Sequence, residues 1–267
     1  MAWAQSPKIH GLLLDITGVL YNSGEGGGAA IAGSVDAVSS LRTADIPVRF
    51  CTNETQVTCR KLVEKLRRLG FDDIEENEVF SPVPAVVTEL KRRRLRPHLL
   101  VHSAALPDFD GLDTSDPNAV VVGDAAEYFT YDRLNEAFLV LMKSPDVVLF
   151  SLGMGRYYCE TDGLKMDNGA FTRALEYASG KTAEIIGKPA KSYFLSAVNR
   201  LGVSAESVVM IGDDVVSDVG GAQQAGLRGV LVRSGKYRPT DEHHPDVKPS
   251  GIVDDLAQAV DIILRGQ

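Results

Sequence analysis

Short apolar runs alternate with amphipathic segments along almost the whole chain. This alternation is typical of strand and helix units arranged around a parallel sheet. The first apolar run, residues 11–14, shows no polar alternation, as expected for a strand that is covered on both faces. The pattern predicts strands over residues 11–14, 48–51, 99–102, 119–122, 147–151, 184–186, 208–211 and 229–232. It predicts helices over residues 33–42, 56–69, 82–93, 133–143, 171–179, 192–201, 220–225 and 256–264.

The predicted elements fall into two groups. A second set of strands and helices begins after Pro97 and ends near Ala183, where the first pattern resumes. A chain of 267 residues is long enough for one large domain or two modest ones. We therefore expect a doubly wound α/β core with a parallel sheet, made of residues 1–95 and 184–267, and an inserted α/β domain at residues 96–183.

Composition narrows the choice of partner. Apolar residues make up 44% of the chain and charged residues 24%, which is ordinary for a folded globular protein. The net charge of −8 disfavours nucleic acid, because binding to a phosphate backbone needs clustered cations. The one basic run, residues 91–94, falls at the end of a predicted helix, where cations complement the exposed carbonyl groups. We expect no nucleic-acid partner.

The number of cysteines and the N-terminal sequence indicate in which cellular compartment the protein is expected. The three cysteines are a sparse, odd set, and no charged segment followed by an apolar stretch opens the chain. No apolar run reaches the roughly 18 residues that suggest a membrane span. We expect a cytoplasmic protein, with the nucleus also open, and no membrane partner.

Chemically useful side chains follow the apolar runs directly. In doubly wound sheets, ligands bind beyond the carboxyl ends of the strands, so residues at these positions are candidates for a site. Carboxylates suit Mg²⁺, which prefers oxygen ligands, and a lysine can neutralise phosphate charge. Phosphoryl transfer depends mainly on positioning and charge neutralisation, so such a set can catalyse it. The set consists of Asp15, Thr52, Asn53, Lys188, Asp213, Asp214 and Asp218.

Four segments of the chain, in order, resemble the four motifs of the haloacid dehalogenase superfamily of phosphatases. They are Asp15-Ile-Thr-Gly-Val-Leu-Tyr21, Cys51-Thr-Asn-Glu54, Gly187-Lys-Pro189 and Gly212-Asp-Asp-Val-Val-Ser-Asp218. The segment between the second and third motifs resembles the large C2-type cap of that family. Four ordered motifs are far more specific than any one alone. The resemblance implies a Mg²⁺-dependent phosphatase that acts through a phospho-aspartyl intermediate.

The resemblance also implies a role for each matching residue. Asp15 matches the nucleophile that attacks phosphorus. Thr52 and Asn53 match the pair that hydrogen-bonds the transferring phosphoryl group, and they also stand where a helix cap is expected. Lys188 matches the lysine that neutralises phosphate charge. Ile16 lies within the first motif and is included among the predicted substrate contacts.

For the metal, the resemblance implies direct ligation by Asp15, Asp213 and the backbone carbonyl of Thr17. Asp214 and Asp218 are expected to act from further out, through water or by orienting the motif lysine. A solvated acidic turn remains the alternative for these two residues. A cluster of carboxylates without a cation would repel itself, since like charges about 4 Å apart cost about 4 kcal/mol at an effective dielectric near 20.

Thr17 departs from the family pattern. Most family phosphatases have a second aspartate here, which serves as the general acid and base. A threonine hydroxyl cannot deliver a proton at neutral pH as a carboxylic acid can, and general acid catalysis is worth about 10²- to 10⁴-fold. One hypothesis reconciles Thr17 with turnover: the leaving nitrogen of a phosphorus–nitrogen bond can take its proton from solvent. The alternative is a capping threonine in a chain that has lost turnover.

Two further segments narrow the resemblance. Gly155-Arg-Tyr-Tyr158 and the tail Gly235-Lys-Tyr-Arg-Pro-Thr-Asp-Glu-His-His-Pro245 resemble a branch of the superfamily that hydrolyses phosphorus–nitrogen bonds and pyrophosphate. This implies small phosphorylated substrates, including phospholysine, phosphohistidine, imidodiphosphate and inorganic pyrophosphate, and a homodimer. Two rivals stay open: a general phosphomonoesterase for sugar phosphates or nucleotides, and a phosphate-binding regulatory protein with weak turnover. Tyr158 could contact substrate or be buried in an aromatic pair.

Overall fold

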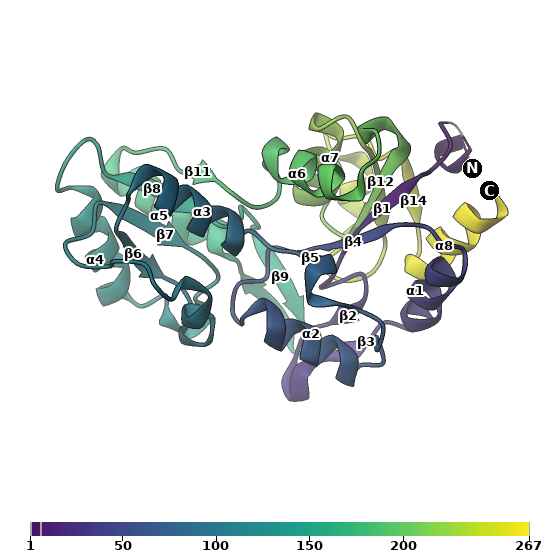
Figure 1. The fold of residues 1–267 in the computed structure, drawn as a ribbon, viewed down its shortest axis with the longest axis horizontal. Coiled ribbons are helices and arrows are strands. Elements are labelled where there is room, and N and C mark those ends of the chain that lie inside the picture. Colours follow the sequence, from purple (N-terminus) through teal and green to yellow (C-terminus); the bar gives the residue numbers. More distant parts are fainter. Residues whose placement is uncertain (1, 6, 267) are drawn as a thin grey trace.

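The structure is a computed structural model that describes residues 2–5 and 7–266. Its larger sheet has six strands, all parallel, and the continuous apolar runs of the sequence form its centre (Figure 1). This core sheet has the order β14 (Gly251–Val253), β13 (Arg228–Val232), β12 (Val208–Gly212), β1 (Gly11–Asp15), β4 (Val48–Cys51) and β5 (Val79–Phe80).

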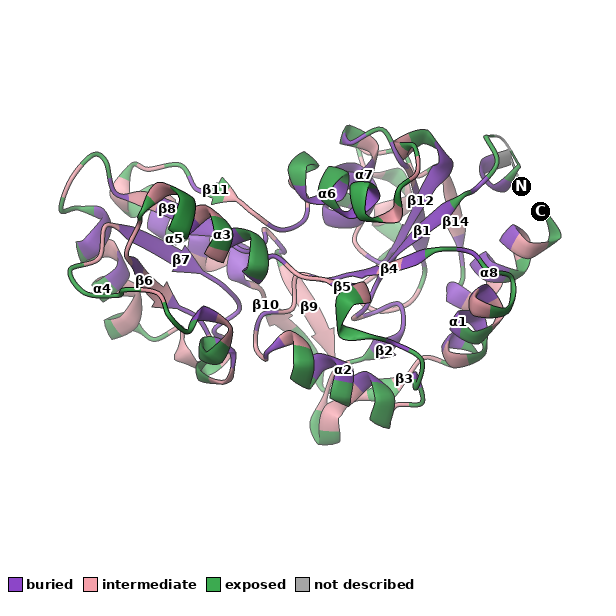
Figure 2. Ribbon diagram, in the orientation of Figure 1, coloured by how far each residue is buried: buried purple, intermediate pink, exposed green. Residues whose placement is uncertain are grey.

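The core sheet is covered on both faces, so its central strands are buried along their whole length (Figure 2). Along β1, Leu12 and Leu14 face one apolar cluster and Leu13 faces the other, because successive side chains of a strand point to opposite faces. Helices α1 (Ser34–Thr43), α2 (Cys59–Arg68) and α8 (Leu256–Arg265) contribute to the first cluster, and α6 (Lys191–Leu201) and α7 (Gly221–Gln224) contribute to the second. This is a doubly wound arrangement, as predicted.

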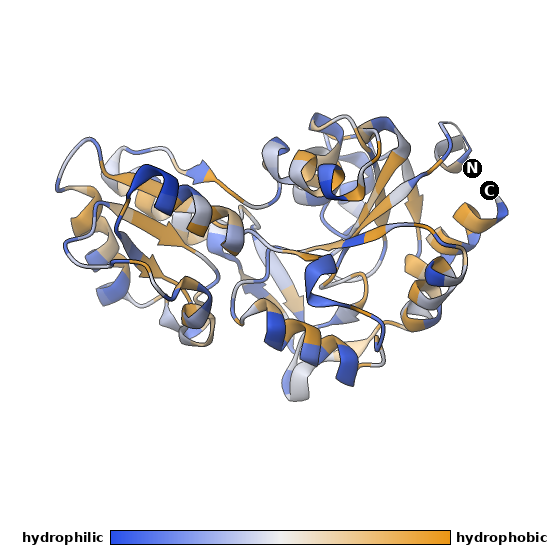
Figure 3. Ribbon diagram, viewed as in Figure 1, coloured by the Kyte–Doolittle hydropathy of each residue, from blue (hydrophilic) through white to orange (hydrophobic). Residues whose placement is uncertain are grey.

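A second parallel sheet forms the cap, with the order β11 (Glu184–Ile185), β8 (Val148–Ser151), β7 (Ala119–Val122) and β6 (Pro97–Leu100). Its apolar strands again lie between helices (Figure 3). Helices α4 (Tyr131–Leu141) and α5 (Asn168–Ser179) pack on one face of this sheet, and α3 (Val83–Arg93) packs on the other. The predicted inserted α/β domain therefore has its own sheet and its own apolar clusters.

Two elements that were predicted to belong to the core belong to the cap in the structure. Helix α3 belongs to residues 1–95, but its buried side chains, such as Val86 and Leu90, pack with Val121 and Phe150 of the cap sheet. Strand β11, predicted as part of the core, pairs with β8 of the cap sheet. We therefore propose that the cap begins between Phe80 and α3 and ends near Ile186, rather than at residues 96 and 183.

Hydrogen bonds join a cap hairpin and a core hairpin, neither of which the hydrophobic pattern predicted. The backbone N–H of Thr161 donates to the carbonyl of Ser23 over 3.1 Å, and the Ser23 hydroxyl donates to the carbonyl of Cys159 over 3.1 Å. These bonds attach the cap to the glycine-rich loop of the core. The hairpins are β9 (Tyr157–Glu160) with β10 (Gly163–Met166), and β2 (Tyr21–Asn22) with β3 (Ala29–Ala30).

The remaining helical segments are short. None of the helices in the described part of the chain has the length and apolar character needed to cross a membrane. The segment that follows β12 is a π-helical turn, Val215–Gly220, where the pattern predicted only the start of a helix at residue 220. The 3₁₀ helices are Ala2–Ala4, Glu25–Gly27, Glu76–Glu78, Ser103–Phe109, Ala126–Tyr128, Ala205–Ser207 and Pro239–His243.

Candidate active site

The carboxyl ends of β1, β4 and β12 meet at one edge of the core sheet. Asp15 is the last residue of β1, Thr52 follows β4, and Asp213 follows β12. A cavity of about 200 Å³ lies at this edge and is lined by residues of both the core and the cap. The predicted site residues that line it are Asp15, Thr17, Thr52, Asn53, Lys188, Asp213, Asp214 and Asp218. Residues from distant parts of the sequence thus meet as the strand-end argument predicted.

Ile16 is the predicted site residue that does not line this cavity. Its side chain is fully buried in the apolar cluster below the core sheet. Its backbone N–H donates to Oδ1 of Asp15 over 2.8 Å. The structure therefore places Ile16 where its backbone orients the Asp15 carboxylate, and its side chain is not available to a ligand.

Lys188 lies between two carboxylates. Its Nζ is 2.7 Å from Oδ1 of Asp15 and 2.7 Å from Oδ1 of Asp218, and the lysine is only 3% exposed. Burial by itself would lower the pKa of Lys188, but the charges of Asp15 and Asp218 outweigh burial and hold the pKa above its usual value. Lys188 is therefore a fixed positive charge beside the carboxylate of Asp15.

The loop that carries Lys188 is held by Asn53. The amide of Asn53 accepts from the backbone N–H of Lys188 over 2.8 Å and donates to its carbonyl over 2.9 Å. Gly187 is required here because a Cβ would collide with the carbonyl of Leu152 and with Asn53 itself. Asn53 thus positions the lysine, and one N–H of its amide is left for a ligand.

Thr52 is buried next to this loop. Its hydroxyl oxygen accepts from the backbone N–H of Glu54 over 2.9 Å, so the hydroxyl proton is free to be donated elsewhere. Its carbonyl accepts from the hydroxyl of Tyr193 over 3.1 Å. The predicted donor role of Thr52 stays a prediction, and the side chain has the hydrogen-bonding capacity for it.

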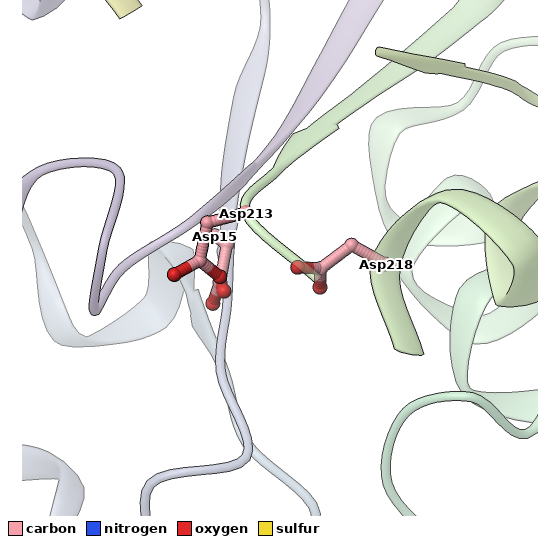
Figure 4. A group of neighbouring side chains, drawn as sticks. All are labelled: Asp15, Asp213 and Asp218. Atoms are coloured by element: carbon pink, nitrogen blue, oxygen red, sulfur yellow. The ribbon is translucent and has the colours of Figure 1, made fainter. Parts of the chain in front are cut away.

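Three buried carboxylates form a group that could hold a metal ion. Asp15, Asp213 and Asp218 each offer an oxygen, and these atoms lie within 4.8 Å of one another (Figure 4). Burial raises the pKa of Asp213 to about 7, against the opposing charge of Lys236. Oδ1 of Asp213 is buried and has no hydrogen-bond partner among the described residues. Lys188 is the one ammonium that pairs with this group among the described residues, so the negative charges of the three carboxylates outnumber it, and a cation would offset the excess.

The acidic residues after β12 divide into two roles. Asp218 contacts the lysine as predicted, and it also belongs to the group that could hold a metal, which the prediction did not include. Asp214 points elsewhere: its Oδ1 caps the following helical turn, and its Oδ2 is 2.9 Å from Nζ of Lys236. Burial would raise the pKa of Asp214, but the Lys236 ammonium and the Ser217 N–H hold it below its usual value.

Lys236 was not predicted as a site residue. Its backbone N–H donates to Oδ2 of Asp213 over 2.8 Å, and its ammonium pairs with Asp214. Burial would lower the pKa of Lys236, but Asp214 and Asp213 outweigh burial and raise it well above its usual value. Lys236 follows strand β13 by four residues, so the strand-end rule could have identified it.

The cap contributes an acidic wall. Gln56 donates to Oδ2 of Asp124 over 2.7 Å. Tyr158 also lines the cavity. The sequence left open whether Tyr158 contacts substrate or is buried in an aromatic pair. Burial, then the nearby charge of Asp167, raises the pKa of Asp124 to about 7. Glu160 also lines this wall. Polar side chains of the cap thus line the same cavity as Asp15, Lys188 and Asp213.

Comparison with known proteins places this site in a family. The family model of the haloacid dehalogenase-like hydrolases matches residues 12–109, and a second hydrolase model of the same group matches residues 185–259. Human haloacid dehalogenase-like hydrolase domain-containing protein 2 is 43% identical over 254 residues, or 95% of this chain and 95% of that protein. The chain belongs to the haloacid dehalogenase-like hydrolases. The predicted family and enzyme class are confirmed.

Other relatives are more similar. The bovine phospholysine phosphohistidine inorganic pyrophosphate phosphatase is 56% identical over 265 residues, covering 99% of this chain and 98% of that protein. The human protein of the same name is 56% identical over 257 residues, covering 96% of this chain and 95% of that protein. The resemblance to a branch of the superfamily, drawn from residues 155–158 and the tail, is thus confirmed.

Solved structures confirm the fold. The 4-nitrophenylphosphatase of Thermotoga maritima has a TM-score of 0.83 and 24% identity, covering 96% of this chain and 97% of that chain. The p-nitrophenyl phosphatase of Archaeoglobus fulgidus has a TM-score of 0.83 and 21% identity, covering 96% of this chain and 99% of that chain. The doubly wound core with an inserted α/β domain is therefore a known architecture.

Proposed function

We propose that the chain is a phosphatase that transfers a phosphoryl group to the carboxylate of Asp15 and then to water. The observation that carries this proposal is the placing of Lys188, at 2.7 Å, between Asp15 and Asp218 in a cavity at the strand ends. A buried ammonium fixed beside a nucleophilic carboxylate can neutralise an incoming phosphoryl group, whose oxygens carry the charge.

Each residue has one task in this reaction. Asp15 attacks phosphorus, and its orientation is fixed by the Ile16 N–H and by Lys188, which both bind Oδ1. The hydroxyl of Thr52 and the remaining N–H of Asn53 donate to the oxygens of the transferring group. As the bond between Asp15 and phosphorus forms, the bond between phosphorus and the leaving group breaks, and the leaving group keeps the electron pair and takes a proton from solvent. The aspartyl phosphate that results is then attacked by water, which regenerates the free carboxylate.

Mg²⁺ fits the group formed by Asp15, Asp213 and Asp218. Carboxylate oxygens are the ligands Mg²⁺ prefers, and the unpartnered Oδ1 of Asp213 is a ligand atom without another use. A methyl group at Gly18 would collide with the Asp213 carboxylate, so the chain keeps glycine where the group needs room. When bound, the ion would neutralise negative charge on the phosphoryl oxygens. The predicted ligation by the Thr17 carbonyl stays part of this proposal.

The proposed substrates are those in the names of the relatives: phospholysine, phosphohistidine and inorganic pyrophosphate, together with imidodiphosphate. The acidic wall supports the first two, because Glu160 of the cap and Glu54 of the core line the cavity and would face a leaving group that carries positive charge. A neutral sugar or nucleoside would gain nothing from that wall. A homodimer in the cytoplasm stays part of the proposal.

The test is phosphate release from a substrate panel, with and without a chelator, compared with Asp15→Asn. We expect Mg²⁺-dependent release from phosphoramidates and pyrophosphate and none from the variant. Faster release from sugar phosphates or nucleotides would favour a general phosphomonoesterase. Tight phosphate binding with no release from any compound would favour a regulatory phosphate-binding protein, the reading that Thr17 keeps open.

A further inference from the structure

A chain of hydrogen bonds leads away from the side chain of Thr17. The Thr17 hydroxyl donates to the hydroxyl of Tyr21 over 3.3 Å, and the Tyr21 hydroxyl donates to Oε2 of Glu54 over 2.8 Å. All three residues line the cavity beside Asp15. The two bonds run in the same direction, so each hydroxyl group points its proton toward the carboxylate.

The three residues come from separate elements that the fold brings together. Thr17 lies in the loop after β1, Tyr21 begins β2, and Glu54 lies in the loop after β4. The ring of Tyr21 is fully buried, so its hydroxyl cannot turn freely to solvent. Nζ of Lys65 is 3.5 Å from Oε1 of Glu54 and 4.6 Å from the centre of the Tyr21 ring, which fixes the far end of the chain.

The chemistry of position 17 makes this arrangement useful. Water that attacks an aspartyl phosphate must lose a proton, and a lone threonine hydroxyl is too weak a base to take it. A hydroxyl can accept that proton if it releases its own at the same moment to a partner that is a better base. Glu54 is such a base, and Tyr21 joins it to Thr17.

We propose that Thr17, Tyr21 and Glu54 form a proton relay that replaces the missing carboxylate at position 17 when water hydrolyses the phosphorylated enzyme. The inference rests on the proposed function, because it needs the aspartyl phosphate. In this relay Thr17 is the residue that touches the reacting water. Tyr21 and Glu54 are positioning residues that act through it.

Hydrolysis of the phosphorylated enzyme forms one bond to phosphorus, breaks another and moves three protons. The oxygen of water forms a bond to phosphorus, and the bond between phosphorus and the Asp15 oxygen breaks, returning its electron pair to the carboxylate. The proton of water passes to the Thr17 oxygen, the Thr17 proton passes to the Tyr21 oxygen, and the Tyr21 proton passes to Oε2 of Glu54. Glu54 then releases the proton to solvent through the cavity that it lines.

The relay is tested by following the phosphorylated enzyme in Tyr21→Phe and Glu54→Gln, with pyrophosphate as substrate and acid quenching at short times. Phe removes only the bridging hydroxyl, and Gln keeps the shape of Glu54 but cannot hold the proton. We expect phosphorylation of Asp15 at close to the wild-type rate and its hydrolysis slowed about 10²-fold, the lower end of general base catalysis. Phosphorylated enzyme should therefore accumulate.

A second measurement distinguishes a proton relay from hydrogen bonds that only hold the loops together. Thr17→Asp supplies a base directly, so it should restore hydrolysis in the Tyr21→Phe and Glu54→Gln backgrounds, and the paired changes should be strongly non-additive. Tyr177→Phe, at an exposed tyrosine, and Glu64→Gln, at an exposed helix position, are the matched controls and should behave as wild type.

Three outcomes would overturn the relay. If both variants hydrolyse the phosphorylated enzyme at the wild-type rate, the hydrogen bonds of Thr17, Tyr21 and Glu54 carry no proton. The proposed function would still stand in that case, because the wild-type enzyme would still turn over. Equal loss of both steps, with no restoration by Thr17→Asp, would show a structural tie between the loops. Turnover in wild type without any phosphorylated enzyme would overturn the relay and the proposed mechanism together.

Discussion

Replacing Lys188 with methionine tests the centre of the site. The change keeps most of the length of the side chain and removes the ammonium that lies 2.7 Å from both Asp15 and Asp218. At an effective dielectric near 20, each of these attractions is about 6 kcal/mol before the cost of burial is subtracted. Removing one partner of a buried ion pair leaves an uncompensated charge and typically costs about 3–5 kcal/mol.

We expect Lys188→Met to lower the free energy of unfolding by about 3–5 kcal/mol and to abolish phosphate release. The double change with Asp218→Asn should recover about half of the lost stability, because it removes one of the two stranded charges. Urea unfolding in the presence of a chelator measures this, since a bound cation would mask the effect. Lys191→Met, at an exposed lysine three positions on, is the control.

A Lys188→Met variant whose free energy of unfolding lies within about 1 kcal/mol of the wild-type value, the scale of an exposed ion pair, would refute this prediction. The prediction would also fail if Asp218→Asn destabilised the variant further. Either result would mean that the ammonium does not hold the two carboxylates together in solution.

Three more predictions follow from the site. Thr17→Asp should raise turnover of phosphate monoesters by more than turnover of phosphoramidates, and an equal gain on both would contradict the leaving-group hypothesis. The pKa of Asp124 is raised to about 7 in the folded state, whereas in the unfolded chain this carboxyl loses its proton near pH 4. Between about pH 4 and pH 7 the folded state therefore holds a proton that the unfolded state has lost, so the contribution of Asp124 lowers stability as pH rises. Asp124→Asn should remove a fall of up to about 3 kcal/mol between pH 5 and 8, seen as a flatter dependence of urea unfolding on pH, and an unchanged slope would contradict the buried position. Removing divalent metal should abolish phosphate release and lower the melting temperature, and adding Mg²⁺ should restore both; release that persists in chelator would contradict the metal site.

The central strands could be predicted from the sequence because their signal is local. Strands β1 and β12 are continuous apolar runs that the core covers on both faces, and the helices around them show apolar residues at helical spacing. Strand β5 and the hairpin of β9 and β10 lack such a signal. β5 has two residues, and the four residues of β9 are only half-buried, so tertiary contacts rather than local pattern decide their structure.

The division into domains could not be read from the order of elements. Helix α3 has one apolar face, and the sequence does not say whether the core or the cap covers it; the structure packs that face on the cap sheet. Strand β11 is two residues long and follows the cap, so only its pairing with β8 assigns it.

The site was predictable to the extent that it lies at strand ends. Asp15, Thr52 and Asp213 follow apolar strands directly, and their meeting follows from the topology of a parallel sheet. Lys236 follows β13 and falls under the same rule, but the rule does not give the contacts of Lys236 and Glu54, which are 2.9 Å to Asp214 and 2.8 Å to Tyr21. Nothing in the sequence near these two residues specifies those partners.

The most direct test of the account is to identify the residue that carries phosphate during turnover. Enzyme mixed with pyrophosphate and Mg²⁺ is quenched in acid within the first turnover, digested, and analysed by mass spectrometry for phosphorylated peptides. We expect an acid-stable phosphoryl group on the peptide that contains Asp15 and no such group in Asp15→Asn. Phosphate release at the full rate with that peptide unmodified, or with the group on another residue, would contradict this expectation.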